Sequence, residues 1–203
     1  MLILLRHDLA FLATPKTGST AIEQALTPYA EIIFGRDRKH ITAQRYRRKV
    51  APFLKDAFNA SPQLVAVMRE PLAQIESWYR YRGGARLDGQ PKSTAGISFD
   101  QFVTEVISDD PPPRAQIGSQ FRFLTNGQGK LLTDHLFAYE SLESCVGFLS
   151  DRLGQAIDLP TRNVSPKMET ALDPKTLTQL QEHRAKDFAL YDALKLSGGH
   201  LRA

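Results

Sequence analysis

Short apolar runs alternate with amphipathic stretches along this chain. The runs have the length of buried strands, and most of them lead into a segment with apolar residues at helical spacing. They lie at 9–14, 30–35, 64–68 and 136–139. Fully apolar strands between amphipathic helices are typical of a parallel sheet covered on both faces. We therefore predict an α/β fold, a three-layer α/β/α arrangement around a central, mostly parallel sheet of about four or five strands.

Capping residues and apolar periodicity predict where the helices lie. Helices are expected after the run at 9–14, from Pro71 onward, near 99–107, over 142–153 before Gly154, and in one final segment that Asp173 and Pro174 begin. The longest irregular region, 83–98, falls between the third and fourth strands. Because long loops in compact domains are usually functional, we expect a mobile insert there, within a single domain that spans 1–203.

The composition is that of a globular protein of one domain. The chain has 203 residues, of which 42% are hydrophobic, and no apolar run reaches the roughly 18 residues of a membrane span. Arg6, His7 and Asp8 interrupt the apolar residues at the start of the sequence, so no signal peptide is expected. The only cysteine, Cys145, allows no internal disulfide. These features predict a cytoplasmic protein without stable membrane insertion and without redox chemistry.

Basic residues gather in two stretches rather than along the whole chain. The formal net charge is +4, and the bases are concentrated at 36–49 and 80–86, while acids are more frequent toward the C-terminal third. Such clusters predict docking of an anionic group. Solvated helix faces or loops are the alternative explanation.

The segment after the first apolar run has the composition of an anion-binding turn. Residues 15–20 read PKTGST, which combines a lysine, one glycine and hydroxyls at the start of a helix. Backbone N–H groups and the positive end of the helix dipole converge at such a turn. The lysine precedes the glycine, and the leading glycine of a Walker A loop is missing, so the use of ATP or GTP is not supported. An ordinary turn with a serine N-cap is the alternative.

A second candidate for anion binding follows the third apolar run. Arg69 stands at the expected carboxyl end of a strand, where open parallel sheets bind their ligands. Ser77 lies about two helical turns further on, close enough to share one phosphate with the arginine. The alternatives are an ion pair of Arg69 with Glu70 or another acid, and a solvent-facing Ser77.

Together these two elements resemble the PAPS-dependent sulfotransferases. The PKTGST loop is similar to the strand-borne loop of that family, and REP at 69–71 with SWY at 77–79 is similar to its R-x-P...S-x-Y element. Weaker similarities extend over most of the chain, at 120–124, 137–142, 163–165 and 187–191. The RKG-type segment of the cytosolic phenol and steroid branch is not found, so the chain looks closer to the carbohydrate-type branch.

The resemblance implies a P-loop-like nucleotide crevice at the strand carboxyl ends, with PAPS (3′-phosphoadenosine 5′-phosphosulfate) as cosubstrate. Lys16, Thr17, Gly18, Ser19 and Thr20 would hold the 5′-phosphosulfate, Arg69 and Ser77 the 3′-phosphate, and Asn163 and Ser165 would close over the nucleotide. Lys16 is also a catalytic candidate, because it can reach the bridging oxygen on which charge builds during transfer. No metal is expected, since the acids lack ligand spacing and PAPS carries an activated leaving group.

The acceptor hydroxyl must lose a proton, and histidine is the common base for such a step. His40 lies in the segment RKHIT at 38–42, which resembles the base region of several carbohydrate sulfotransferases, and the other four histidines are expected away from the crevice. Basic residues around His40 would line the acceptor approach and favour an anionic or polyhydroxylated substrate: Arg36, Arg38, Lys39 and Arg45. An exposed loop histidine among solvated charges is the alternative.

The predicted function is therefore PAPS-dependent sulfation of a hydroxyl on a carbohydrate or a similar small acceptor, without a nucleic-acid partner. Trp78 and Phe121 could stack on adenine, but their spacing favours the core. Two other classes of function stay open. A P-loop kinase-like phosphotransferase is disfavoured by the loop order and by the lack of an obvious magnesium aspartate. A non-enzymatic module could bind nucleic acid or another polyanion through 36–49, with a steep salt dependence.

Overall fold

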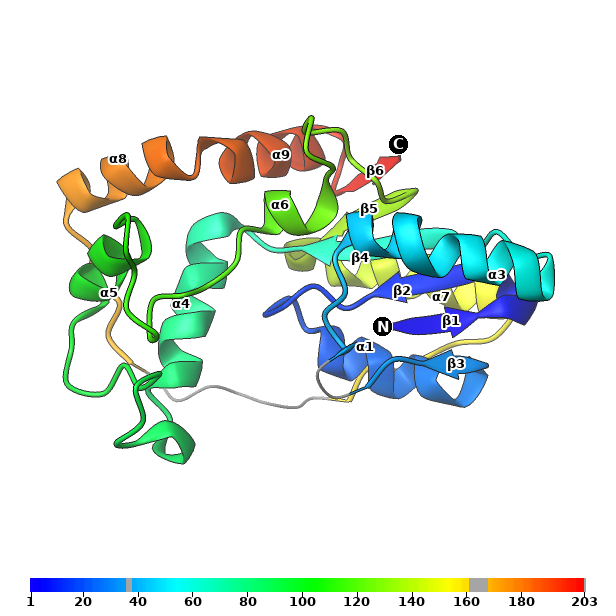
Figure 1. Cartoon of the computed structure of the whole chain (residues 1–203), viewed down its shortest axis with the longest axis horizontal. Helices are drawn as coiled ribbons and strands as arrows, with labels where there is room; N and C mark the ends of the chain where they lie inside the picture. The colour runs from blue at the N-terminus through cyan, green and yellow to red at the C-terminus, as the bar shows by residue number, and fades with distance from the viewer. Residues whose placement is uncertain (36–37, 161–167, 203) are drawn as a thin grey trace.

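The computed structural model describes residues 1–35, 38–160 and 168–202, and it has an α/β fold built on one mixed sheet (Figure 1). Six strands make up the sheet in these residues, in the order β3-β1-β2-β4-β5-β6. The strands are β1 (Leu2–Leu4), β2 (Leu9–Leu12), β3 (Ile32–Ile33), β4 (Gln63–Met68), β5 (His135–Ala138) and β6 (His200–Arg202). The apolar runs at 64–68 and 136–139 thus form central strands, as the pattern predicts, whereas the run at 30–35 forms an edge strand of only two residues.

Parallel pairing is confined to the centre of the sheet. Strand β4 pairs in parallel with β2 on one side and with β5 on the other, so these three strands end at the same edge. Strands β1, β3 and β6 pair antiparallel. The prediction of four or five mostly parallel strands is therefore corrected to six in a mixed sheet. The difference arises because the first residues fold into a hairpin, in which Asp8 takes a left-handed conformation with φ of 53°, and because the C-terminal residues pair with β5.

Helices pack against both faces of the sheet. Successive residues of β4 alternate between two apolar clusters, with Ala66 in one and Val67 in the other, as the period of a strand requires. The first cluster includes side chains of α3 (Ala51–Phe58) and α9 (Ala185–Leu196). The second includes side chains of α1 (Ser19–Leu26) and α7 (Leu142–Leu153), and α7 ends at Gly154 as predicted.

A third apolar cluster lies beside the sheet, where α4 (Pro71–Arg82), α5 (Phe99–Val106) and α8 (Pro174–His183) meet. Figure 1 shows these helices on the left, with α4 leading away from the end of β4. The predicted single final helix is two helices. They meet at Arg184, whose backbone leaves the helical region (φ −106°, ψ 21°). Tertiary bonds accompany this break, because the Asp187 carboxylate accepts hydrogen bonds from Ser119 Oγ and from the Phe121 N–H.

Shorter elements fill the connections. They are α2 (Ala43–Arg45), the π-helical turn Tyr46–Val50, α6 (Gln120–Leu124), and the 3-10 turns Leu5–His7, Thr27–Tyr29, Ala85–Leu87 and Tyr139–Ser141. The segment 83–98, expected to be a mobile insert, is attached to α4: the buried Thr94 donates its hydroxyl hydrogen to the Tyr79 carbonyl, and Tyr79 Oη donates to the Ile97 carbonyl. Among the described helices, none is both long enough and apolar enough to cross a membrane.

Candidate functional site

The loop between β2 and α1 lies at the edge where the three parallel strands end. Lys16 and Gly18 both have positive φ angles, 66° and 68°, which turn the chain sharply into the helix. The N-cap of α1 is Gly18, with no side chain capping the helix, so the expected alternative of a serine N-cap does not describe this turn. The first N–H groups of a helix have no intrahelical partner. This N-terminus can therefore accept an external anion.

The N-terminus of α4 differs in this respect. The Glu70 carboxylate accepts hydrogen bonds from the N–H groups of Leu72 (3.1 Å) and Ala73 (2.6 Å). The Glu70 carboxylate thus caps the start of α4. It forms no ion pair with Arg69, so that alternative for Arg69 is wrong. Of the two helices that follow central parallel strands β2 and β4, only α1 presents an uncapped start to a ligand.

Gly18 is required by close packing as well as by its backbone angle. A Cβ at this position would lie 2.9 Å from Cε2 of Tyr139, the residue that follows β5. The Arg69 guanidinium in turn lies 4.7 Å from the centre of the Tyr139 ring. Tyr139 therefore connects the loop after β2 with the arginine after β4.

Lys16 points toward aromatic side chains of α4. Its Nζ lies 4.1 Å from the ring centre of Tyr81 and 5.6 Å from that of Trp78. Burial, together with the positive charges of Arg69 and Arg82, lowers the pKa of Lys16 to about 8. No acid forms an ion pair with this ammonium in the described part of the chain. An anion placed here would relieve the repulsion among three cations.

Arg69 has a fixed backbone and an unpaired side chain. Gln120 holds the backbone, because its Oε1 accepts from the Arg69 N–H (2.9 Å) and its Nε2 donates to the Arg69 carbonyl (2.8 Å). Within residues 1–35, 38–160 and 168–202, the buried Nε of Arg69 has no hydrogen-bond partner, and the guanidinium forms no ion pair. A buried donor without a partner is costly, which makes this side chain a good candidate for binding an anion.

Arg82 contributes charge but is already committed to the fold. Its guanidinium donates to the carbonyls of Pro113, Arg114 and Gln116, and the residue is only 6% exposed. It also lies 4.9 Å from the ring centre of Trp78. Arg82 therefore raises the positive potential around Lys16 while its donors hold the segment 113–116.

The remaining predicted phosphate ligands occupy different environments. Thr17 is buried and donates its hydroxyl hydrogen to the Thr14 carbonyl, so this hydrogen is already engaged within the loop. Ser19 is buried at the first position of α1, and the exposed Thr20 Oγ1 accepts from Lys39 Nζ. Ser77 is half-buried on α4, one turn before Tyr81. The structure thus brings this serine to the helix flank that carries the Lys16 contact.

His40 lies beside the loop between β2 and α1. Its Nδ1 is 2.6 Å from the carbonyl oxygen of Ala13, which follows β2 directly. Since a carbonyl only accepts, Nδ1 carries the proton and Nε2 keeps a free lone pair in the neutral ring. Although the residue as a whole is exposed, partial desolvation is the main cause that lowers the pKa of His40, and the charge of Lys39 adds to it. The ring is therefore neutral near pH 7.

Two of the other histidines form a pair on the neighbouring strands β5 and β6. His135 Nδ1 lies 3.0 Å from His200 Nε2, at the first residues of β5 and β6. His200 is thus part of strand β6. His7 lies in the turn after β1, and His183 is exposed on α8. In the described residues only His40 lies next to the loop.

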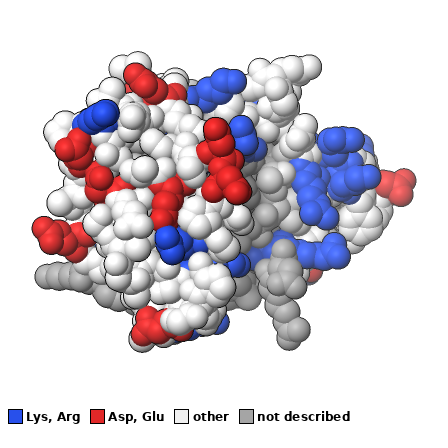
Figure 2. Space-filling model, turned by 60° about the vertical axis from the view of Figure 1, so that its left-hand side comes forward, with Lys and Arg blue, Asp and Glu red and all other residues white. Residues whose placement is uncertain are grey.

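The basic residues around His40 differ in whether they are already paired with an acid. Lys39 forms an ion pair with Glu23 at 2.7 Å, whereas Arg38 and Arg45 are exposed. Figure 2 shows lysine and arginine side chains gathered on one side of the face that it draws, with aspartate and glutamate mainly toward the other side. Three predicted site residues lie outside the described residues: Arg36, Asn163 and Ser165.

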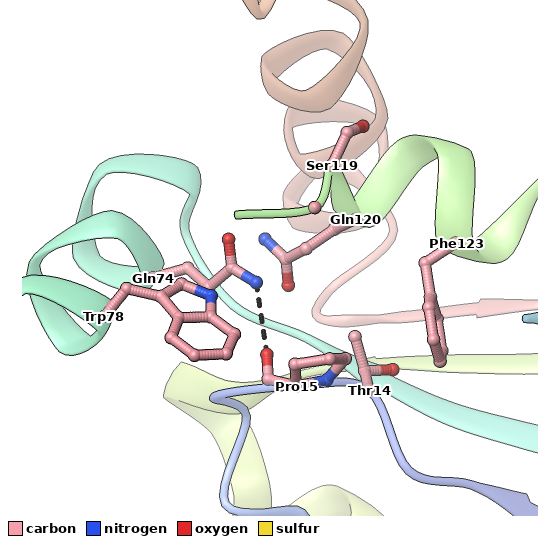
Figure 3. Close-up of a pocket in the computed structure, with 8 residues that line it drawn as sticks. Thr14, Pro15, Gln74, Trp78, Ser119, Gln120 and Phe123 are labelled. Atoms are coloured by element: carbon pink, nitrogen blue, oxygen red, sulfur yellow. Dashed lines mark hydrogen bonds between the residues drawn. The ribbon is translucent and has the colours of Figure 1, made fainter. Parts of the chain in front are cut away.

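A small pocket opens next to the loop (Figure 3). It is lined by Thr14, Pro15, Gln74, Trp78, Gly118, Ser119, Gln120 and Phe123, and its cavity measures about 30 Å³. The Gln74 side chain reaches across it to donate to the Pro15 carbonyl (3.1 Å). Among the described residues, the buried Thr14 Oγ1 and the indole Nε1 of Trp78 have no hydrogen-bond partner.

Several residues of this site were not predicted from the sequence. Tyr81 and Arg82 follow Ser77 and Trp78 by one turn of α4, so helical spacing alone could have placed them on the same flank. Trp78 was assigned to the core, and it packs against the third apolar cluster while also lining the pocket. Tyr139 and Gln120 reach the site from distant parts of the chain, within the segments 137–142 and 120–124 that the sequence marked only as weak similarities.

The site thus combines an uncapped helix start, two unpaired cations and a neutral histidine around the ends of β2 and β4. Such an arrangement can hold a phosphorylated ligand and remove a proton beside it. No protein-family model, curated protein or solved structure matches the chain.

Proposed function

We propose that this protein is a sulfotransferase that moves the sulfuryl group of PAPS to a hydroxyl of a carbohydrate or a similar acceptor. The proposal includes a three-layer α/β/α arrangement with a P-loop-like nucleotide crevice where β2, β4 and β5 end. The observation that carries it is the pair of unpaired cations, Lys16 and Arg69, that follow two adjacent parallel strands. Many functions involve a phosphorylated ligand. We choose this one because the PKTGST and R-x-P...S-x-Y segments resemble those of the PAPS-dependent sulfotransferases.

The two cations suit a ligand with phosphate at both ends. The loop and the start of α1 would hold the 5′-phosphosulfate through backbone N–H groups of residues 16–20. Arg69 and Ser77 would hold the 3′-phosphate, because a guanidinium binds such a group with two parallel hydrogen bonds. Asn163 and Ser165 complete the proposed nucleotide site.

The transfer step is an in-line displacement. The acceptor oxygen forms a bond to sulfur while the bond from sulfur to the bridging oxygen breaks, and adenosine 3′,5′-bisphosphate leaves. Lys16 stabilises the negative charge on the bridging oxygen, and Nε2 of His40 takes the acceptor proton. The neutral state of His40 supports this role, since only the unprotonated ring accepts a proton. Arg38, Lys39 and Arg45 would line the approach of the acceptor.

The test is a thermal-shift panel with adenosine 3′,5′-bisphosphate, ADP, ATP and a short DNA duplex. At a hundredfold excess over its dissociation constant the bisphosphate should stabilise the protein by about 2.7 kcal/mol. For a chain of this size, each kcal/mol raises Tm by roughly 2–4 °C. ADP lacks the 3′-phosphate and should give a much smaller shift.

The Arg69→Ala variant should lose most of the bisphosphate shift. Arg48→Ala is the matched control, because Arg48 is an exposed arginine on the turn Tyr46–Val50. Equal shifts with ADP and the bisphosphate would rule out the sulfotransferase. A dominant shift with ATP would favour a phosphotransferase, and one with DNA would favour a polyanion-binding module.

A further inference from the structure

The helical stretch that follows His40 has one buried side and one exposed side. It runs without interruption from Ala43 to Phe58, through α2, the turn Tyr46–Val50 and α3. Side chains three or four residues apart anchor it in the first apolar cluster: Ala43, Tyr46, Val50 and Leu54. This spacing forms a single stripe toward the core. The rest of the stretch is left to carry a surface function.

The exposed side is strongly basic. Residues 43–58 contain five bases and one acid, Asp56. Arg47 forms an ion pair with Asp134, but the other four bases are exposed, and none of them pairs with an acid within the part of the chain that the structure describes: Arg45, Arg48, Lys49 and Lys55. Positive charges that the fold itself does not neutralise attract an anionic partner.

Two large apolar side chains lie next to these bases. Phe53 is 52% exposed and Phe58 is 50% exposed. Their ring centres are 5.8 Å apart, with an angle of 83° between the rings, so they form one apolar patch. Lys49 precedes Phe53 by one helical turn, which places the charge beside the patch. We call the exposed residues of this stretch, Arg45, Arg48, Lys49, Phe53 and Phe58, the α3 surface.

The combination of bases and exposed rings fits one class of partner better than the other polyanions. The phosphate backbone of a nucleic acid would neutralise the bases but leave the phenylalanine rings in water. An anionic lipid surface accommodates both groups, because the bases interact with the headgroups while the rings enter the boundary with the acyl chains. The charge and the apolar patch of the α3 surface are thus complementary to such a membrane.

The α3 surface is separate from the site around Lys16. Figure 1 shows α3 at the right-hand end of the molecule, away from α4, α5 and α8. The Lys16 ammonium points to α4, where it lies 4.1 Å from the ring centre of Tyr81. Contact through α3 therefore uses none of the groups proposed to bind the 3′- and 5′-phosphates.

We propose that the α3 surface binds the protein reversibly to membranes that contain anionic lipids. Phe53 and Phe58 enter the headgroup region, while Arg45, Arg48 and Lys49 interact with the negative charges of the lipids. The protein lies on the membrane and does not span it. This inference goes beyond the proposed sulfotransferase activity and does not rest on it.

Co-sedimentation of the full-length protein with lipid vesicles tests the proposal. One set of vesicles is pure phosphatidylcholine, and the other contains phosphatidylserine as well. The protein should sediment with the anionic vesicles and much less with the neutral ones. Added salt should release it, because screening weakens the attraction between the bases and the lipids.

Two sets of variants separate the charges from the rings. Arg48→Gln with Lys49→Gln should weaken binding to anionic vesicles about 25-fold, roughly fivefold for each charge removed. Lys175→Gln with Lys195→Gln is the matched control, because these exposed lysines on α8 and α9 carry the same total charge. This control should bind nearly as the parent does.

Phe53→Ala and Phe58→Ala should each weaken binding about three- to tenfold, since about half of each ring is available for burial in lipid. Leu196→Ala is the control, because Leu196 is an 89% exposed apolar side chain on α9. Its binding should be unchanged. Melting temperatures close to that of the parent verify that each variant is folded.

Three results would overturn the inference. They are no sedimentation with anionic vesicles, equal loss in the α3 variants and their controls, and tighter binding to a DNA duplex that the phenylalanine variants retain in full. The last result would make the surface a nucleic-acid site. The thermal shift with adenosine 3′,5′-bisphosphate should be the same in all these variants as in the parent, so failure of membrane binding and failure of the sulfotransferase proposal are distinguishable.

Discussion

The charge of Lys16 should control nucleotide binding in a narrow range of pH. Burial and the neighbouring charges of Arg69 and Arg82 lower the pKa of this lysine from 10.5 to about 8. At pH 9, one unit above that pKa, only about one molecule in eleven keeps the lysine charged. If binding requires the charged form, the affinity for adenosine 3′,5′-bisphosphate should fall by up to about tenfold between pH 7 and pH 9.

Calorimetric titration at several pH values measures this effect, because the ligand phosphates, with a second pKa of about 6, change their ionisation only slightly above pH 7. Lys16→Arg is the control, since a guanidinium keeps its charge over the whole range. Its affinity should be nearly independent of pH. A parent protein with the same flat profile would refute the reasoning, and so would a variant whose affinity falls as steeply as that of the parent.

Without ligand, the same lowered pKa should make the free energy of unfolding rise with pH, whereas the affinity for the nucleotide falls with pH. Between about pH 8 and the ordinary value of 10.5, the unfolded chain binds more protons at this position than the folded one. The free energy of unfolding of the parent should therefore rise with pH in that window relative to Lys16→Arg. Both effects have one cause, the buried ammonium without an acidic partner. Its charge attracts the ligand at neutral pH, and its loss at alkaline pH removes the cost of burying it beside two arginines.

Two further predictions concern the base and the loop. His40→Ala should bind the bisphosphate like the parent but lose on the order of 10²- to 10⁴-fold in turnover, and the parent's rate should rise with pH through a limb that the variant lacks; unchanged turnover would remove His40 from the mechanism. Because burial lowers the pKa of His40 below the ordinary 6.5, the midpoint of this limb should lie below pH 6.5. Gly18→Ala and Gly154→Ala should each cost about 1–2 kcal/mol of stability, since both glycines have positive φ. Only Gly18→Ala should also weaken nucleotide binding, because the added Cβ would meet Tyr139, whereas nothing lies within 4 Å of a Cβ at Gly154. Equal nucleotide affinities of the two variants would contradict the role of this contact.

Local patterns in the sequence were enough to place most elements that build the site. The apolar runs at 64–68 and 136–139 form central strands, and Pro71 and Gly154 mark helix ends where predicted. These features depend on nearest neighbours along the chain, because strand burial, helix capping and the turn at Gly154 each involve only a few consecutive residues. The same local order put Lys16 and Arg69 after their strands.

Only the tertiary structure decided how these elements combine. The antiparallel pairing of β1 and β6 depends on contacts between distant segments, which short apolar runs do not specify. The break at Arg184 accompanies the bonds of Asp187 to the start of α6. The lowered pKa of Lys16 likewise depends on packing, because it comes first from burial and then from the charges of Arg69 and Arg82, which the end of β4 and α4 bring beside the loop. Sequence order determined which residues follow the strands, whereas packing determined their partners, since burial and charge proximity are properties of the folded chain.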